Sequence, residues 1–297
     1  MRRRVMMTGL LAPMALAPTP GWPVPEIVAM ASFSVLADMV RRVGGGLVDV
    51  ASLVPPDADA HAYQPTMADS HILAGAALLV ENGLGLEGWL ARLGEAAGFH
   101  GTHIIASTGV SPRLMREGAI TSIDPHAWQN PRNGAIYAQN IAAGLAAADP
   151  AHGSIYHAGA AAFVDEIERT DAWIEARFAT IPREARRIVT THDAFGYYGD
   201  RYGIAFLAAE GLSTDAEPSA KAIGALVAQI RREKVRAVFL ENMTDPRLAR
   251  TLARETGATL SGPLYSDALS KPDGPAANYL AMLRYNTMLF EHAMRMG

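Results

Sequence analysis

The sequence contains no cysteine, and this absence removes a whole group of chemistries. Disulfides, thiolate metal ligands, thiol nucleophiles and a lipid-modified N-terminal cysteine are excluded. Any metal held by this chain must therefore use histidine, aspartate or glutamate. If the protein is exported, we expect a free periplasmic form and not a surface-tethered one.

Excess positive charge and membrane-length apolar runs are also missing. The 26 Lys and Arg residues are outnumbered by 30 Asp and Glu, for a net charge of -4 and a pI near 6.1. Without a basic stripe, nucleic acid is not expected as a partner. After the N-terminus, Gly, Pro or charge interrupts each apolar run before it could span a bilayer. With 49% hydrophobic residues among 297, the composition indicates a soluble globular chain of two domains.

The first 25 residues have the character of a secretory signal. A basic start at 1–4 is followed by a mostly apolar stretch at 5–17 that ends in Ala-Leu-Ala. This stretch is too short to cross a bilayer, so it indicates export, with a disordered start as the alternative. We therefore assign 1–25 as a signal or disordered segment, without fixing a cleavage point.

From residue 26 onward, short β-rich runs alternate with helical stretches. The expected elements of the first series are strands at 26–30 and 47–54 around a helix at 33–43, and those of the second are strands at 186–191, 204–208, 237–240 and 258–260. This alternation predicts parallel sheets covered by helices on both faces.

One long helix is expected between the two series. Apolar residues recur at helical intervals through 151–178, after the Asp149-Pro150 break. A helix of about 25 residues spans about 38 Å, enough for a stiff strut along two lobes. The predicted organisation is an N-terminal lobe at 26–148, a linking helix at 149–180 and a C-terminal lobe at 181–297.

Two near-copies of one phrase are the strongest functional signal. DAHAYQP occupies 59–65 and DPHAWQNP occupies 124–131, so His61 and His126 hold equivalent places. Paired imidazoles on stiff loops are typical of metal coordination. Thr66 and Asn130 are suitable N-caps for the helices that follow. We therefore expect both histidines on strand-to-helix loops at the carboxyl edge of a parallel sheet, where open α/β sheets bind ligands.

The second series offers two more candidate ligands. His192 comes directly after the strand at 186–191, and Asp267 lies in a loop after the last strand. Three imidazoles and a carboxylate complete a shell for a divalent transition metal. Glu241, which also follows a strand, is the rival carboxylate.

Other polar residues near these motifs have simpler readings. Asp59, Asp124 and Asp193 are either partners of the histidines or loop caps, and capping is slightly favoured. The remaining histidines are interpreted as ordinary surface or core residues: His71, His100, His103, His152, His157 and His292.

Together these segments resemble the periplasmic solute-binding proteins of zinc and manganese ABC importers, cluster A-I. The resemblance runs from Ile27 to the C-terminus through 31–38, both histidine phrases, 191–195, 213–221 and 265–267. It implies an α/β fold of two lobes, each with a parallel sheet flanked by helices. A single long rigid helix joins the lobes, and the metal lies in the cleft between them. It also implies that His61 and His126 come from the N-lobe, and His192 and Asp267 from the C-lobe.

The resemblance further implies a monomer that delivers metal to a membrane permease. Manganese-preferring relatives commonly have Glu at the third ligand position, so His192 favours Zn(II), with Mn(II) as the alternative. Many zinc-specific relatives have a long His- and acid-rich loop before the second phrase. In this chain the segment 100–124 has only two histidines, His100 and His103, and a few charged residues. A separate periplasmic metallochaperone is the corresponding hypothesis for metal supply.

A zinc-dependent hydrolase is the alternative from a different class. It would leave the fourth metal position to water, with Glu241 or Glu217 as general base. Neither His-Glu-x-x-His nor Gly-x-Ser-x-Gly occurs in the chain. Four protein ligands would leave no open position, so we expect a binding protein and not an enzyme.

Overall fold

The computed structural model describes residues 27–117, 120–208, 211, 214 and 218–296. The predicted signal at 1–25 and the candidate base Glu217 lie outside the described residues. Within the described part, no helix combines the length and apolar character needed to cross a membrane.

The N-terminal lobe is built on a four-stranded parallel sheet in the order β2-β1-β3-β4. Its elements are β1 (Ile27–Phe33), α1 (Ser34–Gly44), β2 (Val48–Val54), α2 (Met67–Ala74), β3 (Leu78–Glu81), α3 (Leu90–Ala97) and β4 (Thr102–Ile105). The first three match the predicted strand, helix and strand. Thr66 caps α2 with a reciprocal pair of bonds to Asp69, as its sequence predicts.

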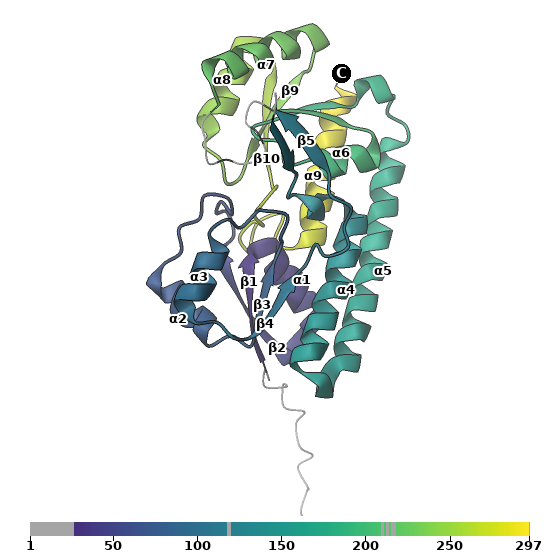
Figure 1. The fold of residues 1–297 in the computed structure, drawn as a ribbon. Coiled ribbons are helices and arrows are strands. Elements are labelled where there is room, and N and C mark those ends of the chain that lie inside the picture. The colour runs from purple at the N-terminus through teal and green to yellow at the C-terminus, as the bar shows by residue number, and fades with distance from the viewer. Residues whose placement is uncertain (1–26, 118–119, 209–210, 212–213, 215–217, 297) are drawn as a thin grey trace, which may run out of the picture.

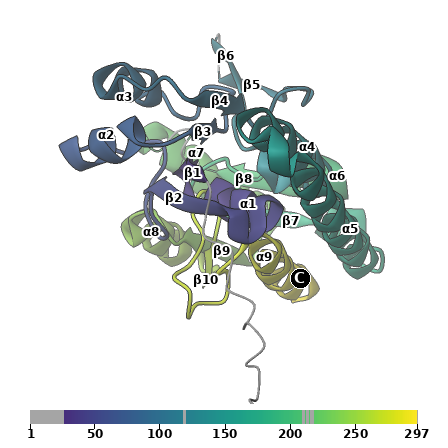
Figure 2. The same cartoon turned by 90° about the horizontal axis from the view of Figure 1, so that it is seen from below.

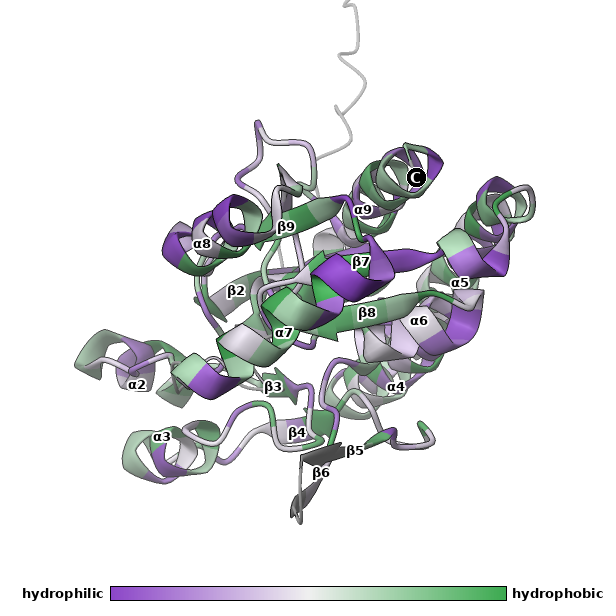
Figure 3. Cartoon of the chain, turned by 90° about the horizontal axis from the view of Figure 1, so that it is seen from above, coloured by the Kyte–Doolittle hydropathy of each residue, from purple (hydrophilic) through white to green (hydrophobic). Residues whose placement is uncertain are grey.

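The C-terminal lobe repeats this plan with a parallel sheet in the order β10-β9-β7-β8. Its elements are β7 (Arg187–Thr190), α6 (Gly196–Tyr202), β8 (Ala205–Ala208), α7 (Ala220–Glu233), β9 (Ala237–Glu241), α8 (Pro246–Thr256), β10 (Thr259–Leu264) and α9 (Tyr279–Arg295). Seen from above, α7 crosses over the largely apolar strands of this sheet (Figure 3).

Two long helices flank both lobes. After α4 (Pro131–Ala148), α5 (Gly153–Phe178) runs back along it and also packs on α1 and α9 (Figure 1). Viewed from below, α4 and α5 lie on the side opposite α2 and α3 (Figure 2). The predicted fold class, two α/β lobes with a long helix, is thus confirmed. The lobe boundaries at 26–148, 149–180 and 181–297 remain a prediction.

The main hydrophobic core is continuous between the lobes. It includes Phe33 and Val54 of the first lobe, Phe163 of α5, and Phe239 and Phe290 of the second. A separate small core beneath α7 and α8 fills the outer face of the second sheet. The lobes are therefore joined by shared packing as well as by the chain.

One element was not expected. A two-stranded antiparallel ribbon, β5 (Leu114–Glu117) and β6 (Ile120–Ile123), stands between β4 and the second histidine phrase. His126 thus follows a strand of this ribbon, and the prediction that it ends a strand of the parallel sheet is wrong. The other three candidate ligands do follow strands of the parallel sheets.

Candidate metal centre

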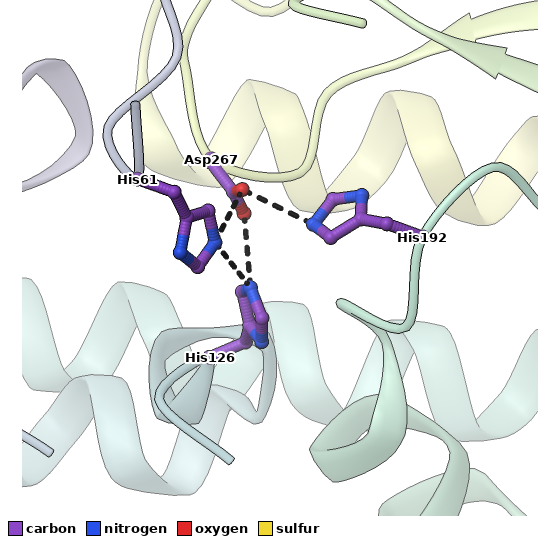
Figure 4. A group of neighbouring side chains, drawn as sticks. All are labelled: His61, His126, His192 and Asp267. Atoms are coloured by element: carbon purple, nitrogen blue, oxygen red, sulfur yellow. Dashed lines mark hydrogen bonds and ion pairs between the residues drawn. The ribbon is translucent and has the colours of Figure 1, made fainter. Parts of the chain in front are cut away.

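The structure brings His61, His126, His192 and Asp267 together between the lobes (Figure 4). One ligand atom of each lies within 4.8 Å of the others. His61 lies between β2 and α2, and His126 between β6 and α4. His192 comes directly after β7, and Asp267 follows β10. Among the described residues, none of the other histidines joins this group.

The three imidazoles present their Nε2 atoms to the Asp267 carboxylate. Asp267 Oδ2 lies 3.3 Å from His61 Nε2 and 3.2 Å from His192 Nε2, and Oδ1 lies 3.6 Å from His126 Nε2. His61 Nε2 is 3.2 Å from His126 Nε2. Neighbouring ligand atoms of a tetrahedral ion are about 3.3 Å apart when the bonds are about 2.0–2.1 Å. The separations of 3.2–3.6 Å among the three Nε2 atoms and the two Asp267 oxygens are close to this value, and one ligand atom from each residue lies within 4.8 Å of the others, so the cluster can surround one small cation.

Buried carboxylates face the Nδ1 atoms of two histidines. Asp124 Oδ1 lies 2.8 Å from His126 Nδ1, and Glu241 Oε2 lies 2.8 Å from His192 Nδ1. A carboxylate at Nδ1 holds the proton there and leaves the Nε2 lone pair free to bind a metal. Both Asp267 oxygens are buried without a hydrogen-bond donor among the described residues. Inward lone pairs without donors are what a cation site requires, so the residues fit a divalent metal.

Glu241 is therefore not placed as the fourth ligand. Its Oε1 accepts hydrogen bonds from the backbone of Thr191 at 3.0 Å and of His192 at 3.1 Å, while Oε2 faces the His192 ring from behind. Asp267 occupies the position inside the cluster. The rival assignment of Glu241 as a ligand lacks geometric support, and its visible contacts are those of an orienting partner.

The three aspartates of the motifs differ in role. Asp59 Oδ1 accepts from the backbone of His61 at 2.8 Å, which is a loop cap. Asp124 both caps the backbone of His126 at 3.0 Å and contacts its ring. Asp193 is half-buried, and burial raises its pKa despite the nearby charge of Arg113. Asp59 also accepts from Thr214 Oγ1 of the second lobe at 2.6 Å through Oδ2, so capping alone describes neither Asp59 nor Asp124.

The charges of the site act strongly on one another. Burial alone would lower the pKa of His192, but Glu241 and Asp267 outweigh it and hold that pKa well above the usual value. Burial likewise acts to raise the pKa of Asp267, yet His126 and His192 hold it well below its usual range. The opposite pKa directions of His192 and Asp267 reflect their mutual attraction, and a cation bound at the imidazole would compete with protons for it.

Hydrogen bonds across the lobes hold the two halves of the site together. Trp128 Nε1 and Gln129 Nε2, from the second histidine phrase, donate to Ser266 O at 3.0 and 2.7 Å. The backbone of Asp57 donates to Leu269 O at 3.0 Å. These bonds join the loops of His61 and His126 to the loop of Asp267.

Access differs among the ligands. The His61 side chain is 5% exposed, whereas those of His126, His192 and Asp267 are fully buried. Beside the loop of His61 lies a cavity of about 440 Å³, lined by Asp59 of the first lobe and by Thr214, Met243 and Thr244 of the second, among others. The cluster is therefore closest to solvent on the His61 side of the cleft.

Two α/β lobes with a cluster of three imidazoles and a carboxylate between them are typical of a substrate-binding protein whose substrate is a metal ion. Residues 29–293 match the family model of ZnuA, the periplasmic component A of the zinc-uptake complex. The chain belongs to this family. The family comprises extracytoplasmic metal-binding components of ABC importers, so the chain is a binding protein and not an enzyme, as the sequence predicts.

The proteins similar to this chain are named for three different metals. The chain is 31% identical to the iron-binding protein YfeA of Yersinia pestis, over 94% of this chain and 90% of that protein. The manganese-bound periplasmic metal-binding protein of Candidatus Liberibacter asiaticus has a TM-score of 0.81 at 30% identity, over 90% and 99% of the chains. The periplasmic zinc-binding protein TroA of Treponema pallidum has a TM-score of 0.85 at 26% identity, over 91% and 99%. The comparisons thus establish divalent-metal binding and leave the metal open.

Proposed function

We propose that this protein captures Zn(II) in the periplasm and delivers it to the membrane permease of an ABC importer. His61, His126, His192 and Asp267 are the proposed ligands. The observation that carries the proposal is the convergence of three Nε2 atoms on one buried carboxylate at separations of 3.2–3.6 Å. Such spacing suits a tetrahedral ion, and a majority of imidazole ligands suits zinc better than hard manganese.

The pre-set tautomers support tight capture. Two of the three imidazoles have a carboxylate at Nδ1, so little reorganisation is needed when the ion arrives. The opening beside His61 supports entry and release on that side of the cleft. In this proposal the protein acts as a monomer, and a metallochaperone supplies the zinc that the missing His-rich loop would otherwise help to collect.

Mn(II) is the second candidate, and one feature favours it. Both oxygens of Asp267 face imidazole nitrogens, so the carboxylate is placed to bind through two oxygens. Bidentate binding raises the coordination number above four, which suits the hard Mn(II) ion better than Zn(II).

X-ray absorption on the zinc-loaded protein tests the proposed coordination. We expect a four-coordinate shell of three nitrogens and one oxygen at about 2.0 Å. The matched sample is His100→Ala, which removes a histidine outside the cluster and should leave the spectrum unchanged. A shell of five or six light atoms would contradict the four-coordinate zinc site. If His61→Ala removed one histidine signal from the spectrum and left the zinc affinity unchanged, the assignment of His61 as a ligand would be contradicted.

A further inference from the structure

Arg113 joins the two lobes directly behind His126. It lies just before β5, and its Nη1 donates to Asp124 Oδ2 at 3.1 Å, while its Nε donates to Asp200 Oδ2 at 3.1 Å. Asp124 is fully buried and Asp200, in α6 of the second lobe, is 70% exposed. One guanidinium thus connects a surface carboxylate of one lobe to the carboxylate that orients a candidate ligand of the other.

Helix α6 also contacts the backbone of Arg113 and Asp124 through Tyr197. Tyr197 Oη accepts from the backbone N–H of Arg113 at 2.8 Å and donates to Asp124 O at 3.1 Å. Gly196 lets α6 approach, because a Cβ there would lie 2.4 Å from Arg113 Nη1 and 2.7 Å from Asp124 Oδ2. A side chain at position 196 would therefore have to displace the Arg113 guanidinium from this contact.

Asp124 has two oxygens with separate tasks. Oδ1 accepts from the backbone of His126 and contacts its ring, and Oδ2 accepts from Arg113. Since both oxygens belong to one rigid carboxylate, fixing Oδ2 also fixes the angle at which Oδ1 meets the ring. Helix α6 begins four residues after His192, so the same contacts also tie the loop of His192 to that of His126.

We propose that Arg113 is a positioning residue: seating of α6 against it fixes Asp124 and thereby holds His126 ready to bind metal. This inference rests on the proposed function. When the lobes are together, Arg113 bridges Asp124 and Asp200 with two donors of its planar fork, an arrangement that a lysine cannot reproduce. When α6 moves away, Asp124 loses one anchor and His126 loses its fixed orientation, which favours release of the ion.

The test compares R113Q with the matched variant R177Q. Arg177 also forms a part-buried ion pair, with Glu291, but that pair contacts none of the candidate ligands. We expect R113Q to bind zinc about 10–100-fold more weakly, the usual cost of losing an outer partner of a metal ligand. Zinc should also leave it faster, as measured by transfer to a chelator. R113K should recover only part of the affinity, and R177Q should match the wild type.

Proton–nitrogen NMR of the imidazole rings supplies a second readout. In metal-free R113Q, the Nδ1–H signature of His126 should weaken, whereas that of His192, held by Glu241, should stay. A purely structural role would leave both rings unchanged or disturb both. Wild-type zinc affinity in R113Q with an unaltered His126 ring would overturn the proposal. If R113Q does not fold, D200N removes the outer anchor alone, and it should show the same changes to a smaller extent.

The two hypotheses fail separately. Absence of zinc binding in the wild-type protein would contradict the proposed function, yet the NMR comparison uses metal-free protein and still decides the role of Arg113. Conversely, normal zinc binding by R113Q would refute the positioning role and leave the ligand assignment intact.

Discussion

Replacing Glu241 with glutamine should separate an orienting carboxylate from a ligand. In the wild-type protein, Glu241 Oε2 lies 2.8 Å from His192 Nδ1, and its negative charge favours a proton on that nitrogen. Glutamine keeps the acceptor that serves the Thr191 and His192 backbones, but it loses the negative charge. If its amide nitrogen faces the ring, Nδ1 must accept, and the proton moves to Nε2, where it blocks metal binding.

The expected loss follows from this geometry. Loss of an outer partner of a metal-bound histidine weakens binding about 10–100-fold, or about 1.4–2.7 kcal/mol. Removing the charge also removes part of the cause that raises the pKa of His192, so competition by protons decreases. We therefore expect E241Q to bind one equivalent of zinc with reduced affinity and a shallower pH dependence. Competition with a chromophoric chelator between pH 5.5 and 8 measures both.

Glu87 provides the matched control for this experiment. It is also buried, and its carboxylate accepts from Ser32 Oγ at 2.6 Å and from the Asn82 backbone at 2.7 Å without contacting a histidine. E87Q should therefore bind zinc as the wild type does. If E241Q loses stoichiometric binding as completely as His192→Ala, Glu241 is itself a ligand. Unchanged affinity in E241Q would show that it does not orient the ring.

Three further outcomes are expected. Alanine at His61, His126 or His192 should abolish tight zinc binding, while Asp267→Ala should weaken it less because water can enter the vacated position; isothermal titration of the four variants would contradict this if Asp267→Ala were the most damaging. Zinc affinity of the wild type should fall as the pH is lowered, starting above pH 6.5 because the pKa of His192 is raised, and an affinity constant from pH 5 to 8 would refute proton competition. Burial raises the pKa of Glu87 to about 7 from 4.5, so the folded state binds this proton more tightly than the unfolded chain, and the free energy of unfolding falls as the pH rises from 4.5 to about 7. Over this pH range the melting temperature of metal-free E87Q should fall less than that of the wild type. Equal pH profiles of the two proteins would contradict this expectation.

The sequence predicts the fold well where local pattern and global arrangement agree. The strand, helix and strand at 27–54 have clear periodicity, and Asn130 and Pro131 begin α4 as expected. The sequence does not predict the ribbon of β5 and β6, because its strands have four residues each, too short for alternation to be distinguished from a loop. Its presence is why His126 does not end a strand of the parallel sheet.

The candidate ligands could be found from sequence, but their supporting residues could not. A repeated phrase and two strand ends identified the four residues that the structure brings together. The contact of Glu241 with His192 depends on β9 lying next to β7, and strand order is not written in local periodicity. Arg113 likewise has no motif, because its partners lie 11 and 87 residues away. Only the contacts of α6 with Arg113 and Asp124, on either side of the ribbon, reveal it.

A competition titration of metal-free wild-type protein with Zn(II) and Mn(II), with elemental analysis of the purified protein, tests the central claim most directly. We predict one equivalent of tightly held zinc, displaced by manganese only in large excess and lost in His192→Ala. Tighter binding of manganese would contradict the assignment of zinc as the transported metal, and no stoichiometric metal would contradict the site itself.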